Sequence, residues 1–199
     1  MQSHMTIPRE PRSVRYERGL RRDYTRAPQI SKTYLLGMLH DATERKSTYR
    51  IATKSNLFAR FLCNEIKKFG LSAWFYKEGK NRNLWIVEFS KTLLKVVRVK
   101  TERNKIDYIR GYFDSEGGIS KNLKVRYYLY FAQKNKSDLL EVKNYLEDLN
   151  ISCGKLHNPS KRVDPNYWRF FVSSKSYEDF YKIIGSSHPE KKVYLRMKI

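Results

Sequence analysis

Residues 108–118 read YIRGYFDSEGG, and this stretch decides the fold. Its Gly111 stands inside a helical pattern, where a glycine costs about 1 kcal/mol relative to alanine. Such a cost is tolerated where a second backbone must approach closely. A related stretch at residues 34–42, YLLGMLHDA, has Gly37 at the matching place. We therefore expect two helices that pack against each other at these glycines.

The two stretches open two copies of one repeat, in the order helix, two strands, helix, two strands, helix. Strands at 49–55 and 129–135 precede amphipathic helices predicted from apolar residues three and four apart. Another pair of strands and a closing helix complete each copy. The predicted strand pair of the second copy covers 151–158 and 167–173, the amphipathic helices cover 55–70 and 136–150, and the closing helices cover 90–97 and 174–184.

This order predicts an α+β protein with two pseudo-symmetric αββαββα halves, residues 31–98 and 99–199. Residues 1–30 form a basic N-terminal extension, which is either a disordered tail or an arm that follows phosphates. The second methionine, Met5, follows so soon that residues 1–5 read as a possible cloning scar.

The charge balance points to a polyanionic partner. The chain of 199 residues has 41 Lys and Arg against 20 Asp and Glu, a formal charge of +21. Such self-repulsion opposes folding, and its usual reason is a partner whose condensed counterions are released on binding. No apolar stretch approaches the roughly 20 residues of a membrane span, and no signal peptide is expected. Isolated Cys63 and Cys153 and four scattered histidines indicate neither a disulfide framework nor a zinc site.

Alternation along the strands separates a core face from a basic and aromatic face. Over residues 124–134 the odd positions are apolar or aromatic, whereas the even positions include Lys124, Arg126, Tyr128 and Tyr130. Residues 167–172 repeat this pattern, with Tyr167 and Arg169 opposite three apolar side chains. Lys, Arg and Tyr together favour a nucleic-acid-binding sheet, and a two-stranded ribbon fits the DNA major groove.

Glu116 is the candidate metal ligand. It lies just before Gly117 and Gly118, which suit a helix C-terminal cap. A carboxylate at a helix C-terminus opposes the helix dipole, so it gains nothing locally. Two such acids brought together suit Mg²⁺, which binds one or two carboxylates together with phosphate oxygens. Metals held in this way stabilise the attacking and leaving oxygens of phosphodiester hydrolysis.

The two motifs resemble the LAGLIDADG signature of homing endonucleases, in the monomeric, two-motif, intron-encoded form found in archaea. The resemblance covers about residues 31–195. It implies two halves packed through the motif helices, with antiparallel sheets forming a saddle over a long, asymmetric DNA site. It also implies Mg²⁺-dependent hydrolysis of both strands, with Mn²⁺ as a substitute metal, by an acid at the end of each motif. In the second motif that acid is Glu116.

The first motif departs from this pattern, because the matching position is occupied by Ala42 and the next by Thr43. Either Asp41, one residue earlier, serves as the ligand, or this half has lost it; we favour Asp41. The resemblance also places a basic residue near each scissile phosphate, here Lys54 and Lys134. The residues expected to bind DNA are Arg45, Lys46, Arg50, Lys121, Lys124, Arg126, Tyr128, Tyr130, Tyr167 and Arg169.

We thus expect an intracellular endonuclease of a prokaryote, acting on duplex DNA as a pseudo-dimer within one chain and without a protein partner. The altered first motif favours an alternative, a maturase or regulator of the same fold with reduced or absent cleavage. A generic RNA-binding module is a third possibility, but none of its usual signatures is present.

Overall fold

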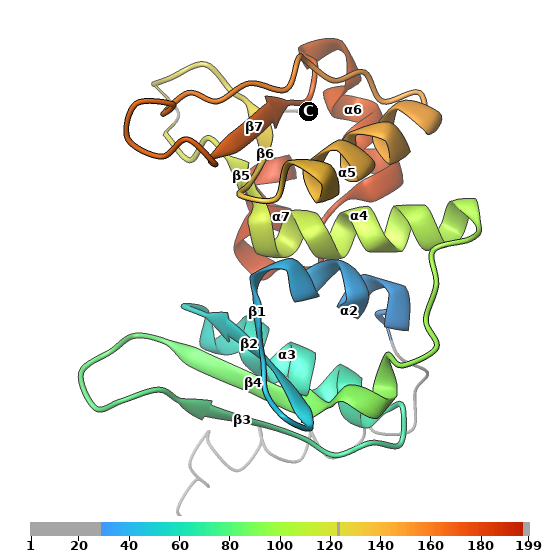
Figure 1. Ribbon diagram of the computed structural model, residues 1–199, viewed down its shortest axis with the longest axis vertical. Helices are drawn as coiled ribbons and strands as arrows, with labels where there is room; N and C mark the ends of the chain where they lie inside the picture. The colour runs from blue at the N-terminus through green and yellow to red at the C-terminus, as the bar shows by residue number, and fades with distance from the viewer. Residues whose placement is uncertain (1–28, 123, 197–199) are drawn as a thin grey trace, which may run out of the picture.

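Two helices lie side by side at the centre of the computed structural model, which describes residues 29–122 and 124–196 (Figure 1). They are α2 (Lys32–Met38) and α4 (Glu102–Glu116), the predicted motif helices. One antiparallel sheet lies beside α2 and another beyond α4 (Figure 1). Most of the extension expected at residues 1–30 falls outside the described residues. The predicted α+β class and the helix pair are confirmed.

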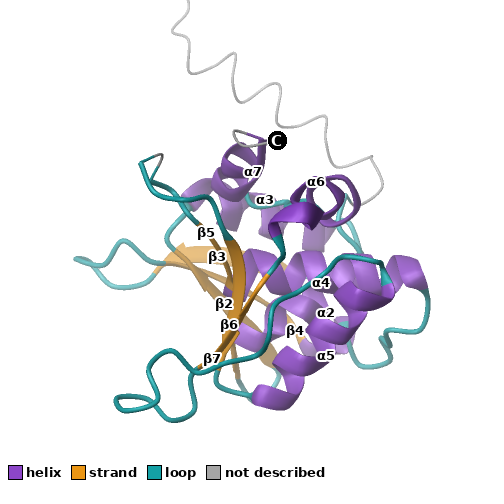
Figure 2. Ribbon diagram, turned by 90° about the horizontal axis from the view of Figure 1, so that it is seen from above, coloured by secondary structure: helices purple, strands orange, loops and turns teal. Residues whose placement is uncertain are grey.

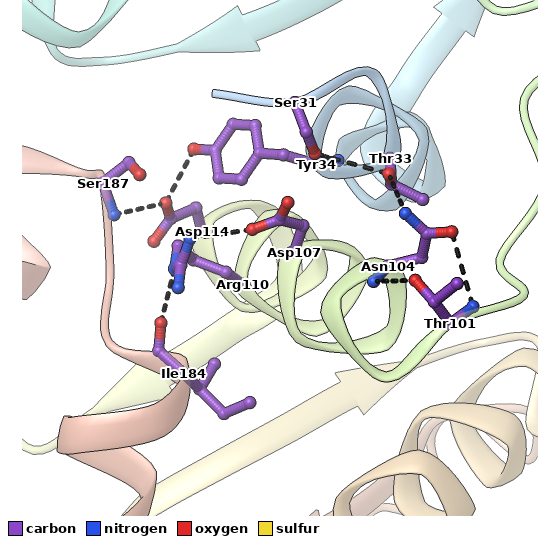
Figure 3. A network of polar contacts seen from close by, with 10 residues as sticks. All are labelled: Ser31, Thr33, Tyr34, Thr101, Asn104, Asp107, Arg110, Asp114, Ile184 and Ser187. Carbon is purple, nitrogen blue, oxygen red and sulfur yellow. Dashed lines mark hydrogen bonds and ion pairs between the residues drawn. The ribbon is translucent and has the colours of Figure 1, made fainter. Parts of the chain in front are cut away.

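The glycines explain why α2 and α4 approach so closely. A Cβ atom on Gly37 would collide with the backbone carbonyl of Tyr108, and one on Gly111 with the carbonyl of Tyr34. Each tyrosine stands three residues before the glycine of its own helix, so the crossing is pseudo-symmetric. Polar contacts extend along the same interface, where Asn104 donates to Thr33 at 3.4 Å (Figure 3). The predicted role of both glycines is therefore correct.

The first half follows the predicted order as far as its second pair of strands. Strands β1 (Ala42–Glu44) and β2 (Thr48–Thr53) precede α3 (Asn56–Lys67), whose N-cap is Ser55. Strands β3 (Ala73–Lys77) and β4 (Trp85–Ser90) complete an antiparallel sheet of order β1-β2-β4-β3. The closing helix predicted at 90–97 is only a 3-10 turn, Lys91–Leu93. Leu93 and Leu94 are buried there, so two apolar anchors suffice without a longer helix.

The second half has a three-stranded sheet of order β5-β6-β7, one strand fewer than predicted. Strands β5 (Gly117–Ile119) and β6 (Leu129–Gln133) precede α5 (Lys136–Asp148), and β7 (Trp168–Phe171) comes last. The strand predicted at 151–158 forms only isolated bridges, Cys153 with Val172 and His157 with Arg169. The strand predicted from residue 124 begins at Leu129, because the exposed side chains of Lys124, Val125 and Arg126 have no face to bury.

The end of the chain differs most from the prediction. The helix expected at 174–184 is a 3-10 turn (Ser174–Ser176), a short α6 (Tyr177–Asp179) and a π-helical turn (Phe180–Ile184). A further helix, α7 (Pro189–Arg196), was not predicted. It packs back against the end of α4, so the second half is longer than the simple repeat.

Each half has its own buried core, and the motif helices join the two. The core of the first half includes Phe58, Leu62 and Phe89, and that of the second includes Phe113, Phe131 and Phe170. The strands of both sheets face one side of the molecule, with the motif helices and α5 behind them (Figure 2). None of the described helices is long and apolar enough to cross a bilayer.

Candidate active site

Tyrosines from the two motif helices hold each other's ends. The Tyr34 hydroxyl donates to Asp114 Oδ2 at 2.7 Å, and the Tyr108 hydroxyl lies 2.6 Å from His40 Nε2. His40 and Asp114 each stand three residues after the motif glycine, so the two contacts are equivalent by position. The tyrosine of each half therefore fixes the helix end of the other half.

Asp114 is the more strongly held of these two helix ends. Its buried carboxylate also accepts hydrogen bonds from Ser186 Oγ at 2.5 Å and from the backbone amides of Ser187 and His188 (Figure 3). Burial raises the pKa of this carboxyl, and the neighbouring Lys191 and the donors oppose the rise. Asp114 is thus an internal anchor and is not available to a metal or to solvent.

Glu116 and Asp41 come together at the ends of the motif helices. Burial, and then the charge of Asp41, raises the pKa of Glu116 to about 7. Burial also raises the pKa of the exposed Asp41, with the charge of Lys191 opposing it. Gln133 Nε2 donates to Glu116 Oε1 at 2.8 Å and to the carbonyl of His40 at 3.2 Å. One amide group therefore connects the acid of the second motif to the end of the first.

The glycines after Glu116 serve sterics and not the left-handed cap that the sequence suggested. Gly117 is the C-cap of α4 with an extended backbone, φ −78° and ψ 150°, and it begins β5. A Cβ atom here would collide with the Phe113 ring, and one on Gly118 with the Tyr130 ring. The carbonyls at the helix end consequently need another partner.

Lys191 of α7 supplies that partner. Its Nζ donates to the carbonyls of Phe113, Asp114 and Gly117 at 2.5, 2.9 and 2.7 Å. A positive charge at a helix C-terminus is favourable, because the carbonyls there carry partial negative charge. Burial lowers the pKa of Lys191 to about 8, against the raising effect of Asp114 and Glu116. This ammonium group stabilises the helix end that carries Glu116.

The two predicted lysines have different surroundings. Lys54 lies on a cavity of about 530 Å³, together with Gly117 and Gly118 at the end of the second motif. Lys134 is 75% exposed at its side chain, and its Nζ is 3.7 Å from Asp164. It follows Gln133, which contacts the end of the first motif. Each lysine thus stands at the end of a strand that approaches the motif of the other half.

The outer face of the first sheet is basic but largely neutralised. Arg50 of β2 lies 3.1 Å from Glu78 and 3.8 Å from Glu88, and Glu88 also accepts hydrogen bonds from Thr48 and Tyr76. Arg45 and Lys46 are exposed in the turn that joins β1 to β2. The sequence did not indicate that the glutamates of β4 and of the β3–β4 loop would face Arg50.

The outer face of the second sheet is cationic and aromatic. The Arg169 guanidinium stacks over Tyr130 at 4.6 Å and over Tyr167 at 5.3 Å, and its Nη2 donates to the Tyr167 hydroxyl at 2.8 Å. Among the described residues, no acid pairs with it, and its buried Nε has no partner. Lys121, Lys124, Arg126 and Tyr128 are exposed beside this face.

Three residues of the site were missed, and two of them left a signal in the sequence. Asp114 is an acid three residues after Gly111, on the face of a helix that packs against another. Gln133 is a polar residue at the end of the apolar face of β6. Lys191 left none, because its segment looks like any basic surface helix. Among the described residues, no three His, Cys, Asp or Glu side chains form a metal-binding group.

Comparison with known proteins supports this architecture. Residues 103–185 match the family model of the LAGLIDADG-like domain. The structure of I-DmoI in complex with DNA and Mn superposes with a TM-score of 0.58 and 24% identity, covering 79% of this chain and 97% of that one. No curated protein matches the sequence.

A second group of similar structures is formed by DUF199/WhiA. Its N-terminal LAGLIDADG domain matches with a TM-score of 0.62 and 17% identity, over 92% of this chain and 94% of that chain. Full-length DUF199/WhiA from Thermatoga maritima matches with a TM-score of 0.63 and 18% identity, over 84% of this chain and 59% of that one. Both groups share the fold of paired motif helices and antiparallel sheets.

Proposed function

The chain carries a LAGLIDADG-like domain within a two-motif LAGLIDADG fold, and from this premise we propose that it is a site-specific DNA endonuclease. In this proposal it hydrolyses both strands of a long, asymmetric duplex target with Mg²⁺. The observation that carries the proposal is the meeting of Asp41 and Glu116 at the ends of two packed helices, between two sheets that face the same side.

The two acids fit a hard divalent cation. Asp41 is exposed and accepts no hydrogen bond from the described residues, whereas Glu116 keeps one carboxylate oxygen free of the Gln133 amide. Mg²⁺ is held by one or two carboxylates and completes its coordination with water and phosphate oxygens. The raised pKa of Glu116 reflects crowded negative charge, which a cation would relieve. Such a cation supplies Lewis acidity at the scissile phosphate.

The residues around the acids have separate parts in this proposal. Asp41 and Glu116 hold the metal, while Lys54 and Lys134 stabilise the charge that develops on the phosphate. Gln133 orients Glu116, and Lys191 stabilises the helix end. The outer faces of the two sheets, with the ten residues predicted above, contact the DNA. Solved relatives of I-DmoI are complexes with target DNA and with Mn, Ca or Mg, which is consistent with this arrangement.

A binding-only function is the second candidate, and Ala42 favours it. The position that matches Glu116 by the spacing of 74 residues between Gly37 and Gly111 carries no acid in the first motif. If Asp41 fails to replace it, the chain would bind duplex DNA as a regulator or maturase and cut weakly or on one strand only.

One experiment separates the two functions. The protein is first used to select a duplex by binding from a randomised pool, in EDTA. The selected duplex is then placed in a supercoiled plasmid and incubated with Mg²⁺. Linear product supports the endonuclease, nicked product indicates one active site, and intact plasmid supports the binding-only function. The Asp41→Asn, Glu116→Gln double variant is the control for a contaminating nuclease.

A further inference from the structure

The cavity beside the second motif has a wall that the repeat does not explain. One side consists of Gly117 and Gly118, and the other of Lys54 and Ser55, at the start of α3. The third side comes from the end of the chain and carries His188, Glu190, Lys191 and Tyr194 of α7 and the segment before it. We call this space the α7 cavity.

Positive charge dominates the α7 cavity. Lys54, Lys121 and Lys191 all line it, against the single acid Glu190. Lys191 uses its three N–H groups on backbone carbonyls, so it contributes charge to the wall but no free donor. Lys54 has no polar partner among the described residues. Lys121 Nζ is held by Glu190 Oε2 at 3.0 Å, and both side chains are more than half exposed, 60% and 56%.

One buried polar atom in the wall lacks a partner. His188 Nδ1 is inaccessible to solvent and makes no hydrogen bond with the described residues. Its ring packs against Phe58 of α3, 4.4 Å between centroids, so it is fixed beside the start of that helix. Backbone amides at a helix start add further donors toward an anion. Donors and cations therefore converge on a space with a single competing carboxylate.

We propose that the α7 cavity binds one backbone phosphate of the duplex, in the strand nearest Glu116. This inference rests on the proposed DNA binding but not on cleavage. Lys54 and Lys121 reach the phosphate, and Lys191 lends its charge from the wall. Glu190 occupies Lys121 in the free protein and is displaced by the phosphate. The first motif has no such site, since Lys134 faces Asp164 and no described helix matches α7 there.

The test is a scan of single neutral phosphates in the selected duplex, with binding measured in EDTA. Each position is replaced in turn by a methylphosphonate, which removes one charge. In the wild-type protein we expect one position near the duplex centre to weaken binding clearly. In Lys121→Met the same replacement should have no further effect, because the two changes remove one shared interaction. Lys121→Met should also reduce the slope of log K against log salt by about 1.

Matched variants make the outcome decisive. Lys192→Met removes the same charge one residue later, in a different cavity with Arg110 and Ser186, and should leave the methylphosphonate effect intact. Glu190→Gln should tighten binding of the unmodified duplex. Equal methylphosphonate penalties in wild type and Lys121→Met at every position would overturn the inference while leaving DNA binding in place. Failure to select any duplex would overturn the proposed function as well.

Discussion

The two motif helices begin alike and end differently. Tyr34 and Tyr108, with the glycines three residues later, make the same crossing contacts in both directions. Beyond the glycines, the second motif ends in a buried, fourfold-bonded Asp114 and the half-buried Glu116, whereas the first ends in His40 and the exposed Asp41. The repeat is thus retained where backbones must approach and has diverged where the chemistry and its support lie. The two halves should therefore respond unequally to matched changes.

The largest expected effect is on the acids. Glu116→Gln should reduce cleavage at least about a thousandfold, because the metal and its charge stabilisation are lost. Asp41→Asn should do the same if Asp41 is the second ligand, with DNA binding preserved in both variants. Cleavage rates on each strand, read from end-labelled duplex, give the comparison. Full activity of Asp41→Asn on both strands would show that the first motif has no ligand. Ala42→Asp would then raise double-strand cleavage.

The next largest effect is on stability at the two equivalent helix ends. Asp114→Ala leaves the Tyr34 hydroxyl, Ser186 and two amides without their acceptor and should cost about 3 to 5 kcal/mol. His40→Ala removes the contacts with Tyr108 and Asp138 at a half-buried site and should cost about 1 kcal/mol. Urea unfolding midpoints measure both. Equal losses would mean that the two ends are supported equally.

A third effect depends on pH. Because the folded-state pKa of Glu116 is raised from 4.5 to about 7, the folded protein holds an extra proton in this range. Its stability should fall as the pH rises from about 4.5 to about 7, by on the order of 2 kcal/mol. Unfolding free energies at pH 5 and pH 8, without metal, test this. Glu116→Gln should remove the fall, and Mg²⁺ should reverse it; an unchanged slope in the variant would assign it to another group.

The smallest effect distinguishes the two sheets in DNA binding. Arg169 has aromatic neighbours and no acid, whereas Arg50 is paired with Glu78 and Glu88. Arg169→Met should weaken binding by about 1 to 3 kcal/mol and relax the preference at one base pair. Arg50→Met should cost less, by roughly 1 kcal/mol, because its charge is already compensated. Competition binding with single-base variants of the duplex gives both values, and a larger loss at Arg50 would reverse the comparison.

The sequence predicted what depends on local pattern. The two glycines located the helix crossing, and the polar residues Ser55 and Asn135 stand as N-caps before the predicted helices α3 and α5. Strand alternation correctly placed Arg169 on the outer face and Phe170 in the core. In these cases one residue type meets one requirement of backbone or burial, so the pattern can be read without knowledge of the neighbours.

What could not be predicted depends on contacts between distant segments. The apolar residues of 151–158 suggested a strand, but they bind the sheet only through two isolated bridges. The fold places Lys191 against α4 across more than seventy residues of chain, and nothing near Lys191 marks that contact. The pairing of Arg50 with Glu78 and Glu88 similarly depends on sheet register. Charge counts alone therefore overstated how alike the two DNA-facing surfaces would be.

The exchanged tyrosines have a consequence for how the two halves could be recombined. Because Tyr34 needs Asp114 and Tyr108 needs His40, neither half contains the partner of its own hydroxyl. A symmetric dimer of the second half alone would give each Tyr108 an Asp114, the pairing that Tyr34 now has. It would also place a Glu116 at both helix ends. Such a dimer would read a palindrome, so one duplicated half would convert an asymmetric recognition protein into a symmetric one.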